Sequence, residues 1–143
     1  MYNFIYQEQF KNDKNNNELL NVKNNLFSPD EAFYKGTIFK TLYKPYKTYQ
    51  PAKVNYGGER ERLMRAVQMY ALALNDINLY LAVFPSDKEA LKIRKEYYDK
   101  YKVVKDEYQD KYPAFSLDYD FSEKLPFSFS TDDFPWNREA SYK

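Results

Sequence analysis

The stretch INLYLAVFPSDKEAL, Ile77 to Leu91, decides the fold. Its first half continues a helical pattern, and Pro85 ends that pattern because proline cannot continue a helix. Ser86, with Glu89 three residues later, forms a capping box that predicts the start of a second helix. Since so few residues connect the two helices, we expect them to run antiparallel as a helical hairpin.

Apolar residues recur along both helices of this predicted hairpin at steps of three and four, the spacing of one helix face. The first helix begins at Glu59. The second ends near Tyr112 and carries Arg94 where an apolar residue would fit. The predicted hairpin core consists of Leu63, Val67, Tyr70, Leu74, Ile77, Leu81, Phe84, Tyr97, Tyr101, Val104 and Tyr108.

Two helices cannot enclose a core by themselves, so the stripe of the first helix needs a cover. The sequence offers three: the C-terminal tail, residues 36–56, or another chain. We therefore predict an all-α fold, an antiparallel two-helix hairpin with extended aromatic and proline-rich arms, completed by self-association or by a partner.

Composition divides the chain into four regions. Residues 1–27 form a polar arm too poor in apolar residues to pack, which we expect to be disordered. Residues 28–58 hold a short helix and an extended basic and aromatic segment, 59–112 the hairpin, and 113–143 an extended acidic and aromatic tail.

The short helix is punctuated by the run SPDEAFYKG. Ser28 is the expected N-cap, Pro29 the first helical residue, Glu31 the capping-box partner and Gly36 the terminating residue.

The charged and catalytic residue types limit what the chain can do. It has 22 basic and 21 acidic residues, so its net charge of +1 favours neither nucleic acid nor an acidic membrane surface. It has no cysteine and no histidine, which excludes disulfides, thiolate chemistry and histidine-based catalytic or zinc sites. We predict no catalytic residues, no metal and no cofactor.

The N-terminus lacks the features of a secretory signal, and no segment reaches the apolar length of a membrane span. We therefore expect synthesis in the cytoplasm.

Aromatic residues are unusually frequent, at 20% of a chain whose mean hydropathy is −0.86. Such an excess suits surfaces that become buried against partners. The alternative is a drift from Leu to Tyr in a genome that favours Lys, Asn and Tyr codons.

Residues 32–58 contain five lysines interleaved with aromatics and no acidic residue. This pattern suits single-stranded nucleic acid, and residues 35–56 are the candidate binding segment. The same pattern suits an acidic protein groove. Since residues 114–140 carry six acids against two bases, the arm and the tail could also pair with each other.

Two stretches resemble known families. NLYLAVFPSDKEAL, YYDKYKVVKDEYQDKY and the FPW of the tail resemble the CotJB family of bacterial spore coat proteins over residues 60–138. SPDEAFYKGTIFKTLYKPY, residues 28–46, resembles the CotJA family, whose members carry a Gly-Thr-Ile-Phe run. The chain departs from the CotJB pattern at residues 82–84 and Pro113, and from the CotJA pattern at residues 40–41.

The resemblance implies a structural part of the endospore coat, made in the mother cell and associated with a manganese catalase. We accordingly predict a non-enzymatic scaffold that binds itself and a manganese-catalase-like coat protein. Trp136 is either an anchor for that partner or a residue that folds back onto the hairpin. The predicted partner-binding residues are Gly36, Thr37, Ile38, Phe39, Phe115, Phe121, Phe134, Pro135 and Trp136.

Overall fold

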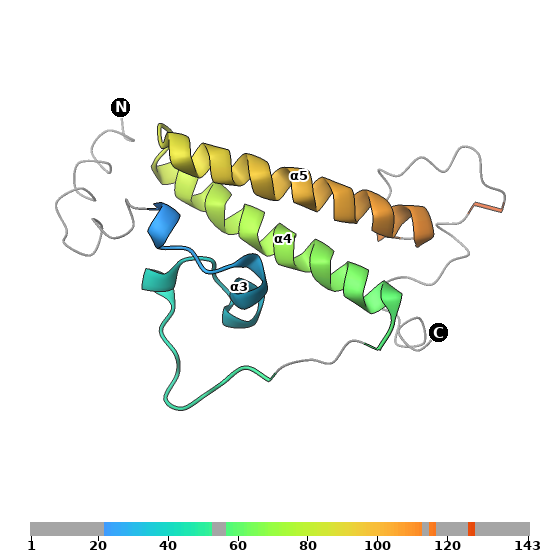
Figure 1. Ribbon diagram of the computed structural model, residues 1–143, viewed down its shortest axis with the longest axis horizontal. Coiled ribbons are helices and arrows are strands. Elements are labelled where there is room, and N and C mark those ends of the chain that lie inside the picture. Colours follow the sequence, from blue (N-terminus) through green and yellow to red (C-terminus); the bar gives the residue numbers. More distant parts are fainter. Residues whose placement is uncertain (1–21, 53–56, 113–114, 117–125, 128–143) are drawn as a thin grey trace. The chain divides into compact units, whose positions relative to one another are not determined.

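The computed structural model describes residues 22–52, 57–112, 115–116 and 126–127 (Figure 1). Two long helices, α4 (Glu59–Val83) and α5 (Lys88–Lys111), form the predicted hairpin. Before them come the short helix α3 (Pro29–Lys35) and the 3-10 turns η1 (Val22–Asn24) and η2 (Lys40–Leu42). The described residues contain no strand, only one isolated β-bridge. The all-α hairpin prediction is confirmed.

The connection between the long helices contains one correction to the predicted caps. Helix α4 ends two residues before Pro85, as expected. Helix α5, however, is capped by Asp87 and not by Ser86, since Asp87 Oδ1 accepts a hydrogen bond from the Ala90 N–H at 3.0 Å. The Tyr80 hydroxyl donates to Asp87 Oδ2 at 2.8 Å and fixes this carboxylate in place, which favours Asp87 as the cap.

Helix α3 has the ends that the sequence predicts. The Ser28 hydroxyl accepts a hydrogen bond from the Glu31 N–H, and the Glu31 carboxylate accepts one from the Ser28 N–H, both at 3.3 Å. Gly36 ends the helix in the left-handed region with φ of 78°. The capping-box and glycine-cap predictions are confirmed.

The chain divides into two compact units, each described separately here. Among the described residues, the first unit contains 22–52 and 68–99, and the second contains the remainder. The core of the first unit combines residues from the N-terminal segment with residues from both long helices. Its buried members are Val22, Ala32, Ile38, Phe39, Ala73, Ile77, Tyr80 and Ala90.

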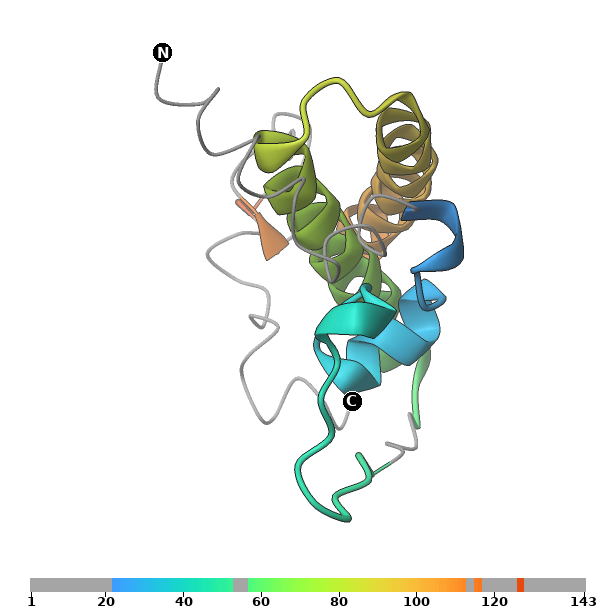
Figure 2. The same cartoon turned by 90° about the vertical axis from the view of Figure 1, so that its left-hand side faces the viewer.

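In this first unit, the segment from Val22 to Leu42 covers α4 (Figure 1). Seen from the end where the long helices join, their connection lies at the top and α3 lies below (Figure 2). The cover therefore includes part of the predicted range 36–56. It also extends back to Val22, inside the range 1–27 that the sequence assigned to a polar arm.

Backbone pairing gives the covering segment its shape. The Phe27 N–H donates to the Ile38 carbonyl and the Lys40 N–H to the Asn25 carbonyl, each at 2.8 Å. The buried Asn25 side chain adds two bonds to Thr41, donating to its Oγ1 at 2.9 Å and accepting from its N–H at 3.1 Å. These bonds close the two ends of the segment around α3.

The second unit has a smaller aromatic core around Tyr108, which is completely buried. Arg60 Nε donates to the Tyr108 hydroxyl at 3.2 Å, and the Phe115 ring meets the Tyr108 ring edge-on at 5.4 Å. At the surface, Lys111 Nζ lies 2.6 Å from Glu59 Oε1. This contact lowers the pKa of Glu59 and raises the pKa of Lys111, so both groups stay charged around neutral pH.

Candidate partner-binding surface

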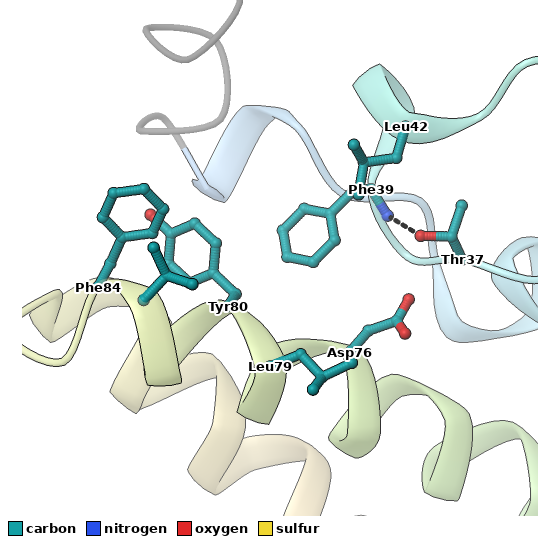
Figure 3. A pocket seen from close by; sticks show the side chains of 8 residues that line it. Thr37, Phe39, Leu42, Asp76, Leu79, Tyr80 and Phe84 are labelled. Atoms are coloured by element: carbon teal, nitrogen blue, oxygen red, sulfur yellow. Dashed lines mark hydrogen bonds between the residues drawn. The ribbon is translucent and has the colours of Figure 1, made fainter. Parts of the chain in front are cut away.

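An apolar hollow of about 210 Å³ lies in the first unit, between the covering segment and α4. Figure 3 shows Phe39 and Leu42 on one side and Leu79 and Tyr80 on the other. The lining residues are Thr37, Phe39, Leu42, Asp76, Leu79, Tyr80, Val83 and Phe84.

The rim of this hollow is apolar and open to solvent. The exposed fractions are 57% for Leu42, 62% for Leu79 and 38% for Val83, whereas Phe39 and Tyr80 at the floor are 4% and 6% exposed. Large apolar side chains grouped in this way are typical of surfaces that bind another protein. We call Leu42, Leu79 and Val83 the apolar rim.

Three aromatic rings pack against one another at the floor. The Tyr80 ring centroid lies 5.5 Å from that of Phe39 and 4.8 Å from that of Phe84. Burial, followed by the hydrogen bond to Asp87, raises the pKa of Tyr80 well above its ordinary value. The Tyr80 hydroxyl is therefore protonated at neutral pH and remains a hydrogen-bond donor.

The two polar residues of the lining hold the backbone of the covering segment. Asp76 Oδ2 accepts a hydrogen bond from the Ile38 N–H at 2.9 Å, and Thr37 Oγ1 accepts one from the Phe39 N–H at 3.2 Å. These two side chains already bind backbone N–H groups of the chain itself. A binding partner in the hollow therefore makes mainly apolar contacts. Within the described ranges, no three acidic residues, histidines or cysteines are grouped as metal ligands.

The predicted partner-binding residues fall into three groups. Thr37 lines the hollow next to the exposed Gly36. Ile38 and Phe39 are buried against the chain's own helices, and Phe39 also lines the hollow. Phe115 is half-buried beside Tyr108 in the second unit. The others, Phe121, Phe134, Pro135 and Trp136, lie outside the described residues, and partner binding by all nine remains a prediction.

The predicted hairpin-core residues differ in burial. Val67, Leu74, Ile77 and Tyr108 are buried. The others are half-buried: Leu63, Tyr70, Leu81, Phe84, Tyr97, Tyr101 and Val104.

In the first unit, the rings of Tyr70 on α4 and Tyr97 on α5 meet at 6.5 Å. Arg94, at its unexpected position on α5, donates from Nε to Asn78 Oδ1 at 2.6 Å.

The sequence predicted Thr37, Phe39 and Phe84 as site or core residues but missed the other residues that line the hollow. Asp76, Leu79 and Tyr80 lie outside the predicted stripe of α4, so they were not candidates. A signal was present, because Ala73, Asp76 and Tyr80 also recur at steps of three and four. This second series indicates that α4 has two faces to cover.

The predicted basic surface is partly engaged within the chain. Lys35 Nζ lies 4.6 Å from the ring centroids of both Phe27 and Tyr43. Further along, Tyr46 and Tyr49 are 71% and 64% exposed. Lys44 and Lys47 are exposed beside them.

Comparison with known protein families identifies both parts of the chain. Residues 61–137, more than half of the chain, match the family described as CotJB protein. Residues 22–46 match the family described as spore coat associated protein JA (CotJA), a match that begins at Val22, the first described residue, which is buried. Both resemblances seen in the sequence are confirmed.

Searches of curated proteins and of solved structures found no match. Among the described helices, none has the length and apolarity needed to cross a membrane. The chain belongs to the CotJB family of spore coat proteins and carries a CotJA segment ahead of its CotJB region.

Proposed function

We propose that this protein is a non-enzymatic scaffold of the endospore coat, which packs with itself and with a manganese-catalase-like coat protein. The observation that carries the proposal is the apolar rim around the hollow. Membership of the coat families supports synthesis in the mother cell followed by incorporation into the coat. In this arrangement the metal and redox chemistry belongs to the catalase-like partner.

The apolar rim can contribute measurable affinity. Fully burying a leucine side chain that was exposed contributes about 1.5–3 kcal/mol. Leu42 and Leu79 are each more than half exposed, so a partner that covers both gains part of this free energy twice. The aromatic floor favours binding further, because Phe39 and Tyr80 are already buried and lose little side-chain freedom when a partner binds.

The test is the light-scattering mass of the purified chain, alone and mixed with a manganese-catalase-like coat protein. Leu79→Glu places a charge on the apolar rim. The matched control is Leu91→Glu, on α5 and 47% exposed, which does not line the hollow. We expect a stable complex with the partner and a self-associated form of the chain alone.

Leu79→Glu should weaken complex formation at least tenfold, and Leu91→Glu should leave it unchanged. Trp136→Ala tests whether the tail contributes a second anchor. A chain that stays monomeric and forms no complex with the catalase-like protein would contradict the scaffold function. Equal losses for the two leucine variants would contradict the assignment of the binding surface to the rim.

The exposed tyrosines and lysines of residues 44–49 favour a second candidate, binding of single-stranded nucleic acid. Phosphates would contact Lys44 and Lys47, and bases would stack on Tyr46 and Tyr49. This function predicts affinity that falls steeply with salt and is abolished by charge reversal at Lys44 and Lys47. Fluorescence anisotropy with a labelled oligonucleotide measures both effects, and salt-independent or absent binding excludes this candidate.

A further inference from the structure

Two segments that match different families share one hydrophobic core in this chain. The CotJA match contributes Val22, Ala32, Ile38 and Phe39, and the CotJB match contributes Ala73, Ile77, Tyr80 and Ala90. Five of these eight residues are 0% exposed: Ala32 and Ile38 from the CotJA match, and Ala73, Ile77 and Ala90 from the CotJB match. The small residues of α4 and α5 let the segment approach the helices closely.

Each residue of the Gly-Thr-Ile-Phe run has a distinct part in this contact. Gly36 takes the left-handed conformation that turns the chain out of α3. The Thr37 hydroxyl accepts the Phe39 N–H, which fixes the local turn. The Ile38 side chain is fully buried in the shared core, and the Phe39 ring packs against the Tyr80 ring.

The decisive polar contact also crosses between the two family matches. The Ile38 carbonyl is satisfied within the segment by Phe27, but the Ile38 N–H has its acceptor on α4, at Asp76 Oδ2. A buried backbone N–H without an acceptor is destabilising. The hydrogen bond to Asp76 therefore favours one position of the segment along α4 over others. Asp76 thereby binds the backbone of the Gly-Thr-Ile-Phe run, while the surrounding core residues pack against its side chains.

The connection between the segment and α4 contributes little to this contact. Residues 44–50 are all exposed, and the described part of the connection forms no helix or strand. A covalent connection acts by raising the local concentration of the segment to roughly the millimolar range. The specificity of docking therefore resides in the segment and in the helix surface.

We propose that the surface formed by Ala73, Asp76, Ile77 and Tyr80 is a docking site for a Gly-Thr-Ile-Phe segment. Residues 22–42 occupy it as an intramolecular ligand, and the same kind of segment from a separate CotJA-family chain fits it in trans. This site is the covered inner surface of α4. The docking surface includes neither Leu79 nor Val83 of the apolar rim, so the Leu79→Glu test of the scaffold function and the docking tests below have separate outcomes.

The test cuts the connection in the folded full-length chain. A specific protease site inserted between Gln50 and Pro51, in the exposed connection, allows cleavage after folding. We expect the two pieces to co-elute in size-exclusion chromatography and to give the intact mass in native mass spectrometry. Separation of the pieces after cleavage would overturn the proposal, whether or not the hairpin piece keeps its helical circular dichroism.

A second arm tests binding in trans. The cleaved protein is taken through urea and refolded with an excess of labelled synthetic peptide of residues 22–46. We expect the label on the hairpin piece, with binding weakened at least tenfold by Ile38→Asp in the peptide. Tyr46→Asp, at a position that is 71% exposed, is the matched control and should bind as the parent peptide does. Absence of label, or equal binding by both variants, would overturn the proposal.

Discussion

Asp76 is the α4 side chain that holds the backbone of the covering segment. It lies on α4 and accepts the Ile38 N–H at 2.9 Å, thirty-eight positions away in sequence. Hydrogen bonds to charged groups contribute more than neutral ones, because the full carboxylate charge faces the donor. Losing the acceptor leaves the Ile38 N–H without a partner beside a fully buried side chain.

We therefore expect Asp76→Ala to lower the free energy of unfolding by about 1–3 kcal/mol. Urea denaturation, followed by circular dichroism, measures this change in the free energy of unfolding. Asp99→Ala is the control, since Asp99 is exposed on α5 and its contact to Lys95 is a surface ion pair at 3.9 Å. Such pairs contribute about 0–1 kcal/mol. Equal effects of the two substitutions would contradict the role of Asp76.

Tyr80 gives the protein a dependence on alkaline pH. Its raised pKa means that the folded state holds the phenolic proton more tightly than the unfolded state, whose tyrosines titrate near pH ~10. The stability contributed by protonated Tyr80 is thus complete below pH ~10 and is lost as the pH rises above that value. We expect Tyr80→Phe to lose less stability than the wild type between pH 9 and 11, roughly the window where tyrosine titrates.

Thermal unfolding at a series of pH values measures this difference. Tyr97, whose pKa burial also raises, is present in both proteins and cancels in the comparison. Parallel decreases in stability for wild type and Tyr80→Phe would show that Tyr80 does not titrate differently in the folded state.

Helix α3 depends on its ends, since seven residues are too few to be stable alone. Gly36 has a φ of 78°, and no atom lies within 4 Å of where its Cβ would be. Substitution there acts on backbone conformation alone. Gly58 also has open space for a Cβ but has no positive φ, so it is a matched control.

Gly36→Ala should destabilise the protein by about 1–2 kcal/mol, the cost of a left-handed conformation for a residue with a Cβ. Gly36→Asn should cost less, because asparagine tolerates this region. Gly58→Ala should be neutral or slightly stabilising. The midpoints of chemical unfolding compare the three, and a harmless Gly36→Ala would contradict the cap geometry.

Among the helices, local signals in the sequence predicted most boundaries correctly. The apolar stripe and Pro85 correctly predicted α4 and its end, and Ser28 and Gly36 correctly predicted the two ends of α3. The start of α5 was predicted one residue early, because Ser86 and Asp87 are both good caps. The choice between them depends on Tyr80, seven residues before Asp87, and that contact is tertiary.

The arrangement of the complete chain was predictable only as a set of alternatives. The stripe of α4 showed that a cover was needed, but the spacing of residues does not say which segment provides it. Val22 looked like part of a polar arm and is 2% exposed, because its neighbours in the core come from helices far along the sequence. The hollow was missed for the same reason, since its walls come from two segments that meet only on folding.

Amide hydrogen exchange of the full-length chain tests most directly whether residues 22–42 and the long helices form one core. The amides of Phe27, Ile38 and Lys40 should exchange slowly and in parallel with the amide of Ile77, because all four lie in hydrogen bonds of the same packed unit. Amides of the exposed residues 44 and 46–48 should exchange within the shortest labelling time. If the Ile38 amide exchanged as fast as these while Ile77 stayed protected, the segment would not be docked on the hairpin.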